Sequence, residues 1–484
     1  MKLLRVAINN YKHIKHIDLK IAERGDEENF PAFFCIGLNG SGKSAFLEAV
    51  ALIFSRISQD ETPGFGFEIA YEVNINGRNE RVEVKPEPDR EKGRLHIVID
   101  GKSYTSFAGL EKYLPYKVIT CISGANSQMR QMISGAARDS VLSDIYDAQK
   151  RGDAEEAEGL KKYLDNLYLN PRMLYLDEEM APYVIFALCA WTSENGEYTS
   201  LRGELLKKAT SGMEPVAISL EAGNEQGGAM LQQLFTPSDN QSESGLADWV
   251  TEGEDGRTAV FGIQETDKGF CNPKIREVYA NPLSLLAVLL QEKERGVLQG
   301  CHFFFRTGKR GELLSEKALS DGEILWLARM GLVLAVSRQE TDNCLFLYDE
   351  PDVHLNENWN VEFISCLEKI AWQEHSRCNH SFWIATHSSL LLTDALPNHV
   401  FQFERDRDEI KARKVPISLF AAGRQEISRS VFHTDAQMGD FAEQRVEKML
   451  DEENPDKILE YIDTLGAGIS RVKLREKYYG RIKG

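Results

Sequence analysis

The residues best suited to chemistry form one glycine-rich segment, Gly37-Leu38-Asn39-Gly40-Ser41-Gly42-Lys43-Ser44, which fits the pattern G-x-x-x-x-G-K-S. An apolar run at 32–36 precedes it and predicts a buried strand, and a helical pattern at 44–55 follows it. In such a loop the backbone N–H groups surround a phosphate, and the helix dipole favours its negative charge. We therefore predict a nucleotide site whose contacts are Gly37, Asn39, Gly40, Ser41, Gly42, Lys43 (phosphate charge) and Ser44 (phosphate and Mg²⁺).

A carboxylate for the metal and a group that activates water are expected at the end of another buried strand. The apolar run 344–348 leads directly to Asp349 and Glu350. We predict that Asp349 holds Mg²⁺ and that Glu350 polarises the attacking water. A competing acidic strand is Met173-Leu-Tyr-Leu followed by Asp177, Glu178 and Glu179. Its apolar run is shorter, so we interpret it as a helix start and keep it as the alternative metal site.

Two further features lie near these acids in the sequence. The segment Leu319-Ser320-Asp321-Gly322-Glu323 precedes an apolar-periodic helix at 324–336, and a serine and glycine at a helix N-terminus can bind phosphate. The same pentapeptide is also an ordinary helix cap. His387 follows the apolar run 381–385. A lone histidine is usually structural, but one at a strand end beyond Glu350 can reach the γ-phosphate.

These four features, in this order, resemble the ABC-type ATPases. The segment 319–323 departs from the family's LSGGQ signature towards the form found in the SMC, RecF and OLD-like branch. Residues 349–355, Asp-Glu-Pro-Asp-Val-His-Leu, resemble that branch, as does the opening Leu4–Ile14. The resemblance implies ATP and Mg²⁺ as cofactors and a homodimer or higher homo-oligomer. It also implies that Lys43, Asp349 and Glu350 act within one subunit, whereas Ser320 and Gly322 complete the site of another.

The family also carries a glutamine in a loop after a strand, where it contacts the metal and the attacking water. Here the predicted strand 116–122 is followed by a loop that contains Gln128. The resemblance assigns Gln128 this catalytic and metal-binding role. An exposed loop glutamine without such a role fits the sequence equally well.

The fold class that follows is α/β, with an ABC-type P-loop ATPase head of a mixed central sheet flanked by helices. Residues 1–130 form its first part, with a small antiparallel sheet expected from alternation at 67–100, and 291–415 form its second part. Between them we expect a largely helical insertion at 131–290, and after them a helical tail at 416–484. Residues 221–256 contain eight acidic residues and no Lys or Arg, which indicates a mobile surface segment.

Composition limits the remaining functions. The 484 residues carry 57 Lys and Arg against 75 Asp and Glu, a net charge of −18, so nucleic-acid binding requires a local basic patch such as Arg471–Lys483. The eight cysteines never occur as C-x-x-C, which favours reduced thiols in a cytoplasmic protein over zinc or disulfides. The longest apolar runs are too short to span a membrane.

The biological function of the ATPase head depends on the elements attached to it. Residues 45–318 are too few and too interrupted for SMC-length arms. Asp406 and Asp408 match the D-x-D of a Toprim nuclease, but they lie in a predicted hairpin turn without the required preceding glutamate strand. The sequence is therefore most similar to the PtuA family of ATPase subunits in Septu-type antiphage defence, whose separate effector is an HNH nuclease. The alternative is a RecF- or SMC-like repair or loading ATPase that acts on DNA directly.

Overall fold

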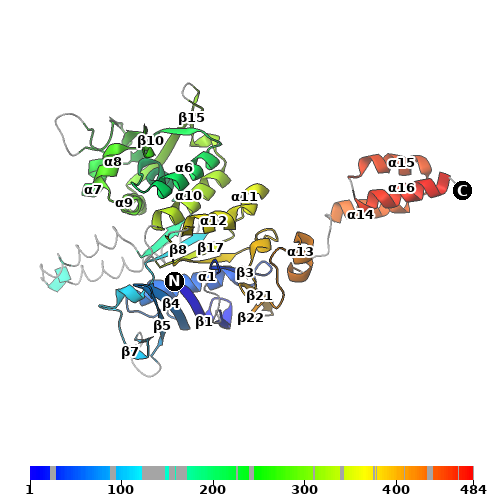
Figure 1. Ribbon diagram of the computed structural model, residues 1–484, viewed down its shortest axis with the longest axis horizontal. Helices are drawn as coiled ribbons and strands as arrows, with labels where there is room; N and C mark the ends of the chain where they lie inside the picture. Colours follow the sequence, from blue (N-terminus) through cyan, green and yellow to red (C-terminus); the bar gives the residue numbers. More distant parts are fainter. Residues whose placement is uncertain are drawn as a thin grey trace. The chain divides into compact units, whose positions relative to one another are not determined.

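The computed structural model has a mixed α/β architecture with several sheets (Figure 1). Its described residues form two compact units, Met1–Ala422 and Gly423–Gly484. The described residues are 1–21, 29–87, 94–122, 148–151, 159, 172–224, 227–238, 245–308, 311–337, 343–373, 376–377, 379–407, 409–432, 440–466 and 468–482.

The central sheet of the first unit has seven strands in the order β22-β21-β3-β20-β17-β8-β9. Adjacent strands pair in parallel from β21 to β9, and only the edge strand β22 is antiparallel. Strands buried on both faces require continuous apolar runs, and this is the pattern of β3, β17 and β20. The bounds are β3 (Ala32–Ile36), β8 (Lys117–Ile122), β9 (Met173–Leu176), β17 (Cys344–Asp349), β20 (Ser381–Ala385), β21 (Val400–Asp406) and β22 (Glu409–Lys414).

Helices cover both faces of this sheet. Helix α1 (Lys43–Ile57) contacts β17 and β20 on one side and β1 on the other, so it lies between the two large sheets. On the opposite face, Phe363 of α12 packs against Tyr348 of β17, with ring centroids 5.9 Å apart. The helices on that side are α10 (Asp321–Val336), α11 (Glu357–Val361) and α12 (Phe363–Ala371), and a short β18–β19 pair follows (Trp372–Gln373, Ser376–Arg377).

A six-stranded antiparallel sheet confirms the small antiparallel sheet that was predicted from the alternation at 67–100. Its order is β2-β1-β4-β5-β6-β7, and its buried face joins the core of α1 and the parallel sheet. The buried Asn343, just before β17, fixes the two sheets together, because its side chain accepts from the Asn74 N–H at 2.9 Å and donates to the Asn74 carbonyl at 2.8 Å. The bounds are β1 (Lys2–Tyr11), β2 (Ile14–Lys20), β4 (Gly66–Ile75), β5 (Arg78–Pro86), β6 (Leu95–Ile99) and β7 (Lys102–Tyr104).

The described part of the insertion at 131–290 contains the expected helices and, in addition, strands that the sequence did not indicate. Helices there alternate with strands that build most of a five-stranded sheet, β11-β12-β10-β15-β16, and a separate β13–β14 pair. The helices are α5 (Ala181–Ala190), α6 (Gly196–Ala209), α7 (Ala229–Leu234), α8 (Pro273–Val278) and α9 (Pro282–Glu294). The strands are β10 (Glu214–Ala222), β11 (Trp249–Glu252), β12 (Arg257–Gly262), β13 (Gln264–Thr266), β14 (Gly269–Cys271), β15 (Leu298–Arg306) and β16 (Leu313–Ser315).

The described residues of the acidic segment 221–256 include regular elements that its composition did not indicate. Its described residues include the end of β10, all of α7 and all of β11. Leu231 and Leu234 of α7 are fully buried, which ties the segment to the folded unit despite its charge. The described acidic residues Glu221 of β10 and Glu252 of β11 are exposed.

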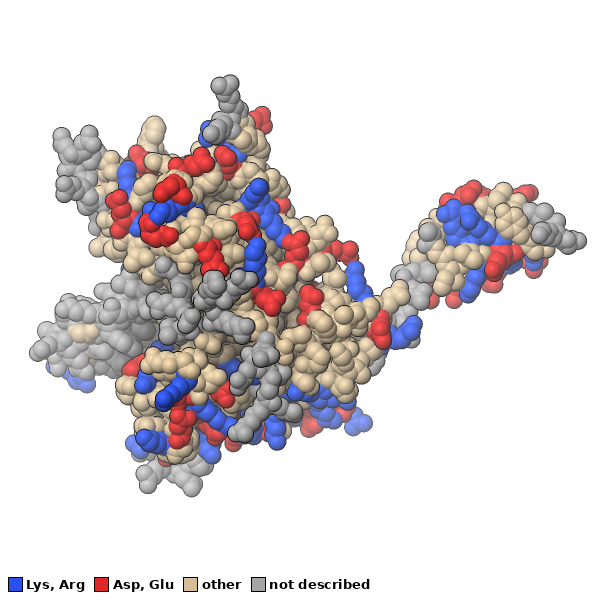
Figure 2. Space-filling model, viewed as in Figure 1, with Lys and Arg blue, Asp and Glu red and all other residues tan. Residues whose placement is uncertain are grey.

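The second unit confirms the helical tail, although it begins at Gly423 rather than at 416. Ala421 belongs to the first unit, where its N–H donates to the Thr393 carbonyl at 2.8 Å. The small core of the second unit is formed by Ile458, Ile462 and Leu474. Figure 2 shows Lys and Arg atoms together with Asp and Glu atoms on this unit, where α16 carries most of the basic segment Arg471–Lys483. The bounds are α13 (Arg424–Phe432), α14 (Asp440–Asp451), α15 (Pro455–Thr464) and α16 (Ile469–Ile482).

Within the described part of the chain, no helix is both long and apolar enough to cross a membrane.

The core of the parallel sheet predicts a large cost for removing one aromatic ring. Trp383 of β20 is fully buried between Phe33 of β3 and Phe401 of β21, with centroids 5.1 and 5.5 Å away. We expect Trp383→Ala to lower the free energy of unfolding by about 3–5 kcal/mol in urea titrations. Trp249, which is 68% exposed, is the matched control, and Trp249→Ala should cost no more than about 0.5 kcal/mol. Equal losses in the two variants would contradict this packing.

Candidate functional site

The glycine loop, residues 37–42, connects β3 to α1 as the sequence predicts. Gly37, Gly40 and Gly42 have positive φ angles of 149°, 75° and 99°. A Cβ at Gly37 would lie 2.2 Å from the Phe403 carbonyl oxygen, and one at Gly42 would lie 2.5 Å from the side chain of Ile410. The loop therefore needs glycine both for its backbone and for its close approach to the β21–β22 hairpin.

The Lys43 ammonium lies inside this loop. The residue is only 4% exposed, and Nζ donates to the carbonyls of Gly37 at 3.0 Å and Leu38 at 3.3 Å. Burial lowers the pKa of Lys43, while the nearby Glu350 and Asp349 carboxylates raise it and so offset part of the effect. The loop thus holds a poorly solvated cation at the place where a phosphate would supply its countercharge.

Ser44 and Asp349 meet although 305 residues separate them in sequence. The Ser44 hydroxyl donates to Asp349 Oδ1 at 2.9 Å. Burial and the neighbouring Glu350 raise the pKa of Asp349 to about 6, against lowering by the Ser44 hydrogen bond and by Lys43. Both side chains offer oxygen atoms, the ligands that Mg²⁺ prefers, and a single carboxylate suffices when phosphates and water supply the rest.

Glu350 and His387 bring a carboxylate and an imidazole to the same place. His387 Nε2 lies 2.8 Å from Lys43 Nζ and 3.3 Å from Glu350 Oε1. Burial and the Lys43 charge lower the pKa of His387, so the imidazole is neutral at pH 7. An ammonium, a carboxylate and a neutral imidazole therefore converge on one point, which suits binding of a phosphoryl group and orientation of a water.

The converging groups open into a depression of about 640 Å³, which is lined by Leu38, Asn39, Glu350 and His387. This volume lies within the usual range for small-molecule sites. Leu38 is 63% exposed at its rim. The depression is large enough for a nucleotide, and its rim offers an apolar contact.

Ser320 and Gly322 have their own contacts at the start of α10. Ser320 caps the helix, since its hydroxyl accepts from the Glu323 N–H at 3.3 Å and Glu323 accepts from the Ser320 N–H at 2.7 Å. A Cβ at Gly322 would lie 2.2 Å from the His354 carbonyl oxygen, so the helix start packs directly on the loop after Glu350. These contacts run to Glu323 and His354 rather than to the glycine loop.

The competing acidic strand lies elsewhere. Met173–Leu176 is strand β9, so its interpretation as a helix start is wrong, although α5 does begin shortly after it. Asp177 is buried and its Oδ1 accepts from the N–H groups of Glu179 and Met180 at 3.0 and 3.1 Å. β9 is the edge strand, four positions from β3, a separation of roughly 19 Å at the usual strand spacing. Asp177 therefore serves the turn into α5.

Gln128, predicted to bind the metal and take part in catalysis, lies outside the described residues.

A contact between two residues that the sequence did not predict supports the site. The Thr386 hydroxyl donates to Asp352 Oδ1 at 2.7 Å and links the loops that carry Glu350 and His387. The sequence positions of Thr386 and Asp352, each within two residues of a predicted site residue, were the available signal. In the opening segment, the hydroxyl of Tyr11 donates to Glu48 Oε2 at 3.4 Å, which ties β1 to α1.

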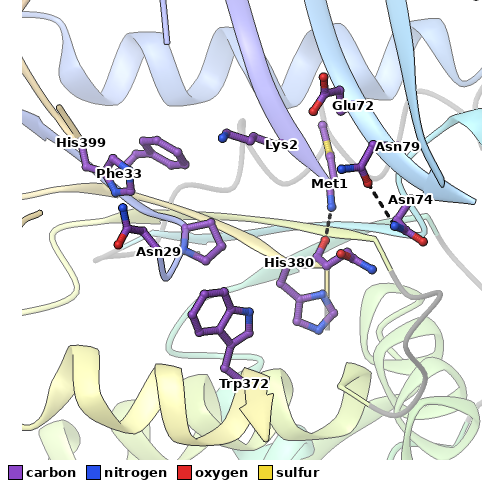
Figure 3. Close-up of a pocket in the computed structure, with 12 residues that line it drawn as sticks. Met1, Lys2, Asn29, Phe33, Glu72, Asn74, Asn79, Trp372, His380 and His399 are labelled. Carbon is purple, nitrogen blue, oxygen red and sulfur yellow. Dashed lines mark hydrogen bonds between the residues drawn. The ribbon is translucent and has the colours of Figure 1, made fainter. Parts of the chain in front are cut away.

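A second, smaller pocket of about 120 Å³ opens where the parallel strands begin, at the opposite end from the glycine loop (Figure 3). Its lining includes Met1, Phe33, Trp372, His380 and His399. The Met1 amine donates to the Asn379 carbonyl there. No residue predicted to bind nucleotide lines this pocket.

No known protein-family model matches this chain, and no curated protein matches its sequence. In the part of the chain that the structure describes, no cluster of three or more His, Cys, Asp or Glu side chains is arranged to hold a metal ion on its own. Function is therefore inferred from the geometry around the glycine loop.

The raised pKa of Asp349 predicts a stability change that depends on pH. Between its ordinary pKa of 3.8 and about 6, the unfolded chain releases a proton that the native carboxyl retains. The wild type thus loses stability as pH rises through this range, by a full amount on the order of 2–3 kcal/mol above pH 6. Asp349→Asn keeps the shape without titrating. Urea unfolding without nucleotide or metal should show its advantage growing from pH 4 to 6 and then staying constant; an advantage independent of pH would contradict this.

Proposed function

We propose that this protein is an ABC-type ATPase that binds Mg²⁺·ATP at the glycine loop and hydrolyses it. The observation that carries the proposal is the convergence of Lys43, Glu350 and His387 on one depression, with Ser44 and Asp349 in contact beside it. These residues follow three adjacent parallel strands, β3, β20 and β17. Ligand sites of α/β sheets lie at the carboxyl ends of such strands.

Each residue has a distinct role in this proposal. The N–H groups of the glycine loop and the ammonium of Lys43 bind the phosphates, which replace the carbonyls of Gly37 and Leu38 as partners of Lys43. Ser44 and Asp349 would hold Mg²⁺, which supplies charge neutralisation and orientation of the phosphates. Glu350 accepts a hydrogen bond from the attacking water, and His387 contacts the terminal phosphate.

The proposal extends to assembly. Ser320 lies at an exposed helix N-terminus, a feature suited to phosphate, and its contacts within the chain do not reach the glycine loop. The exposed Leu38 at the rim of the depression would be covered by a second copy. We therefore place Ser320 and Gly322 of one copy against the nucleotide of another, in a homodimer or a larger assembly of dimers.

In this view the ATPase controls a separate effector, which we propose is an HNH nuclease of Septu-type antiphage defence. This part of the proposal is supported by the resemblance to that class. Asp406 pairs with Glu409 at the end of the β21–β22 hairpin, and Asp408 lies outside the described residues. Mass spectrometry of complexes purified under native conditions tests it. An HNH protein is the expected partner, and a complex with replication or repair proteins would favour the alternative of direct action on DNA.

Substitution of the two central charged residues separates binding from hydrolysis. Lys43→Ala removes the phosphate countercharge and should severely weaken nucleotide binding in calorimetric titrations. Glu350→Gln keeps the shape but loses the base, so it should bind ATP and turn over about 10²–10⁴-fold more slowly. The matched control is Glu178→Gln, which should hydrolyse ATP like the wild type. If Glu350→Gln turned over ATP like the wild type and Glu178→Gln did not, the acidic strand proposed here would be the wrong one.

A mixing experiment tests whether the site is shared between copies. Lys43→Ala and Ser320→Arg subunits should each be inactive alone, because every site lacks one half. Mixed together, they form some sites that carry both defects and some that carry neither. We expect partial recovery of ATPase activity in the mixture. Full activity of a strictly monomeric wild type at nanomolar concentration would refute the shared site.

A further inference from the structure

Arg329, on α10 two turns beyond Gly322, is buried in a way that needs an explanation. Only 2% of the residue is exposed, and its Nη1 donates to the carbonyl of Pro351 at 2.7 Å. A buried guanidinium loses strong hydration, so it persists only where its hydrogen bonds matter. Burial accordingly lowers the pKa of Arg329, although nearby carboxylates and hydroxyls raise it. The acceptor is the carbonyl of Pro351, the residue immediately after Glu350.

The loop that Arg329 contacts has an unfavourable backbone. Glu350 and His354 both have positive φ angles, 48° and 70°, although neither is glycine. Such conformations persist only when surrounding contacts impose them. Glu350 N–H donates to the Ala385 carbonyl at 2.8 Å, which fixes the start of the loop on β20. Its other side rests on α10, through Arg329 at Pro351 and through Gly322 at His354.

We propose that Arg329 is a positioning residue that holds the Glu350 carboxylate in the geometry needed for hydrolysis. Its hydrogen bond to the Pro351 carbonyl holds the residue that follows Glu350, so the carboxylate stays beside His387. The same rigid helix carries Ser320 and Gly322 at its N-terminus, and a phosphate bound there is thereby linked to the position of Glu350. This inference rests on the proposed ATPase function and deepens it.

The chain offers a matched control for a purely structural role. Arg202 on α6 is equally buried, at 1% exposure, and it also holds backbone carbonyls, those of Leu188 at 2.9 Å and Trp191 at 3.0 Å. Those carbonyls close the end of α5 in the insertion. Removing either guanidinium destabilises the protein, but only the loss of Arg329 should affect turnover.

The experiment compares Arg329→Met with Arg202→Met in the full-length protein. We expect Arg329→Met to bind a non-hydrolysable ATP analogue like the wild type but to lower kcat by about 10²-fold, the typical effect of a misplaced catalytic group. Arg202→Met should lower the melting temperature and leave kcat unchanged. Arg329→Lys, which keeps a donor and a charge, should recover part of kcat. Should Arg329→Met not fold, Arg329→Gln, which is too short to reach Pro351, gives the same comparison.

A double variant isolates the path through Glu350. In the Glu350→Gln background, Arg329→Met should cause no further loss of kcat, because the group that it positions is gone. Unchanged kcat in Arg329→Met, or losses that multiply in the double variant, would overturn the positioning role while leaving the ATPase intact. A wild type that hydrolyses no ATP would instead overturn the proposed function itself.

Discussion

The parallel pairing of β20 between β3 and β17 is the constraint on which the site depends. It aligns Cys35, Ala385 and Asp349 in one row at the carboxyl edge of the sheet. Two backbone hydrogen bonds extend the alignment by a residue, from Thr386 N–H to the Cys35 carbonyl at 3.1 Å and from Glu350 N–H to the Ala385 carbonyl at 2.8 Å. The glycine loop, His387 and Glu350 all begin within two residues of this row. A shift of one residue in either pairing would separate them.

Burial gives the converging groups a shared electrostatic character. It favours the neutral forms of Lys43, Asp349 and His387, and it does so most where the loop and the strand ends exclude water. A polyphosphate with its Mg²⁺ brings opposite charges to both the ammonium and the carboxylate. The protein alone therefore holds charges that are poorly solvated and that a bound nucleotide would satisfy, which supports the proposed site.

The sequence predicts the individual strands and the loop at this edge better than it predicts which strands lie next to one another. Uniform apolar runs identify β3, β17 and β20, and glycine chemistry identifies the loop, but no local pattern shows that β20 lies between the other two. The apolar run of β9 has only four residues, which are too few to distinguish a strand from a helix start. Arg329 was missed because a single charge on an apolar helix carries no signal until its carbonyl partner is known. Several strands of the insertion were missed because β11, β13 and β14 are short and partly polar.

The most direct measurement is an experimental structure of the protein with Mg²⁺ and a non-hydrolysable ATP analogue. We expect the terminal phosphate between Lys43 and His387, with the metal on Ser44 and Asp349. We also expect phosphate oxygens to replace the Gly37 and Leu38 carbonyls as partners of Lys43. An analogue bound elsewhere, for example in the pocket beside Phe33, with the Lys43–His387 contact intact, would contradict this expectation.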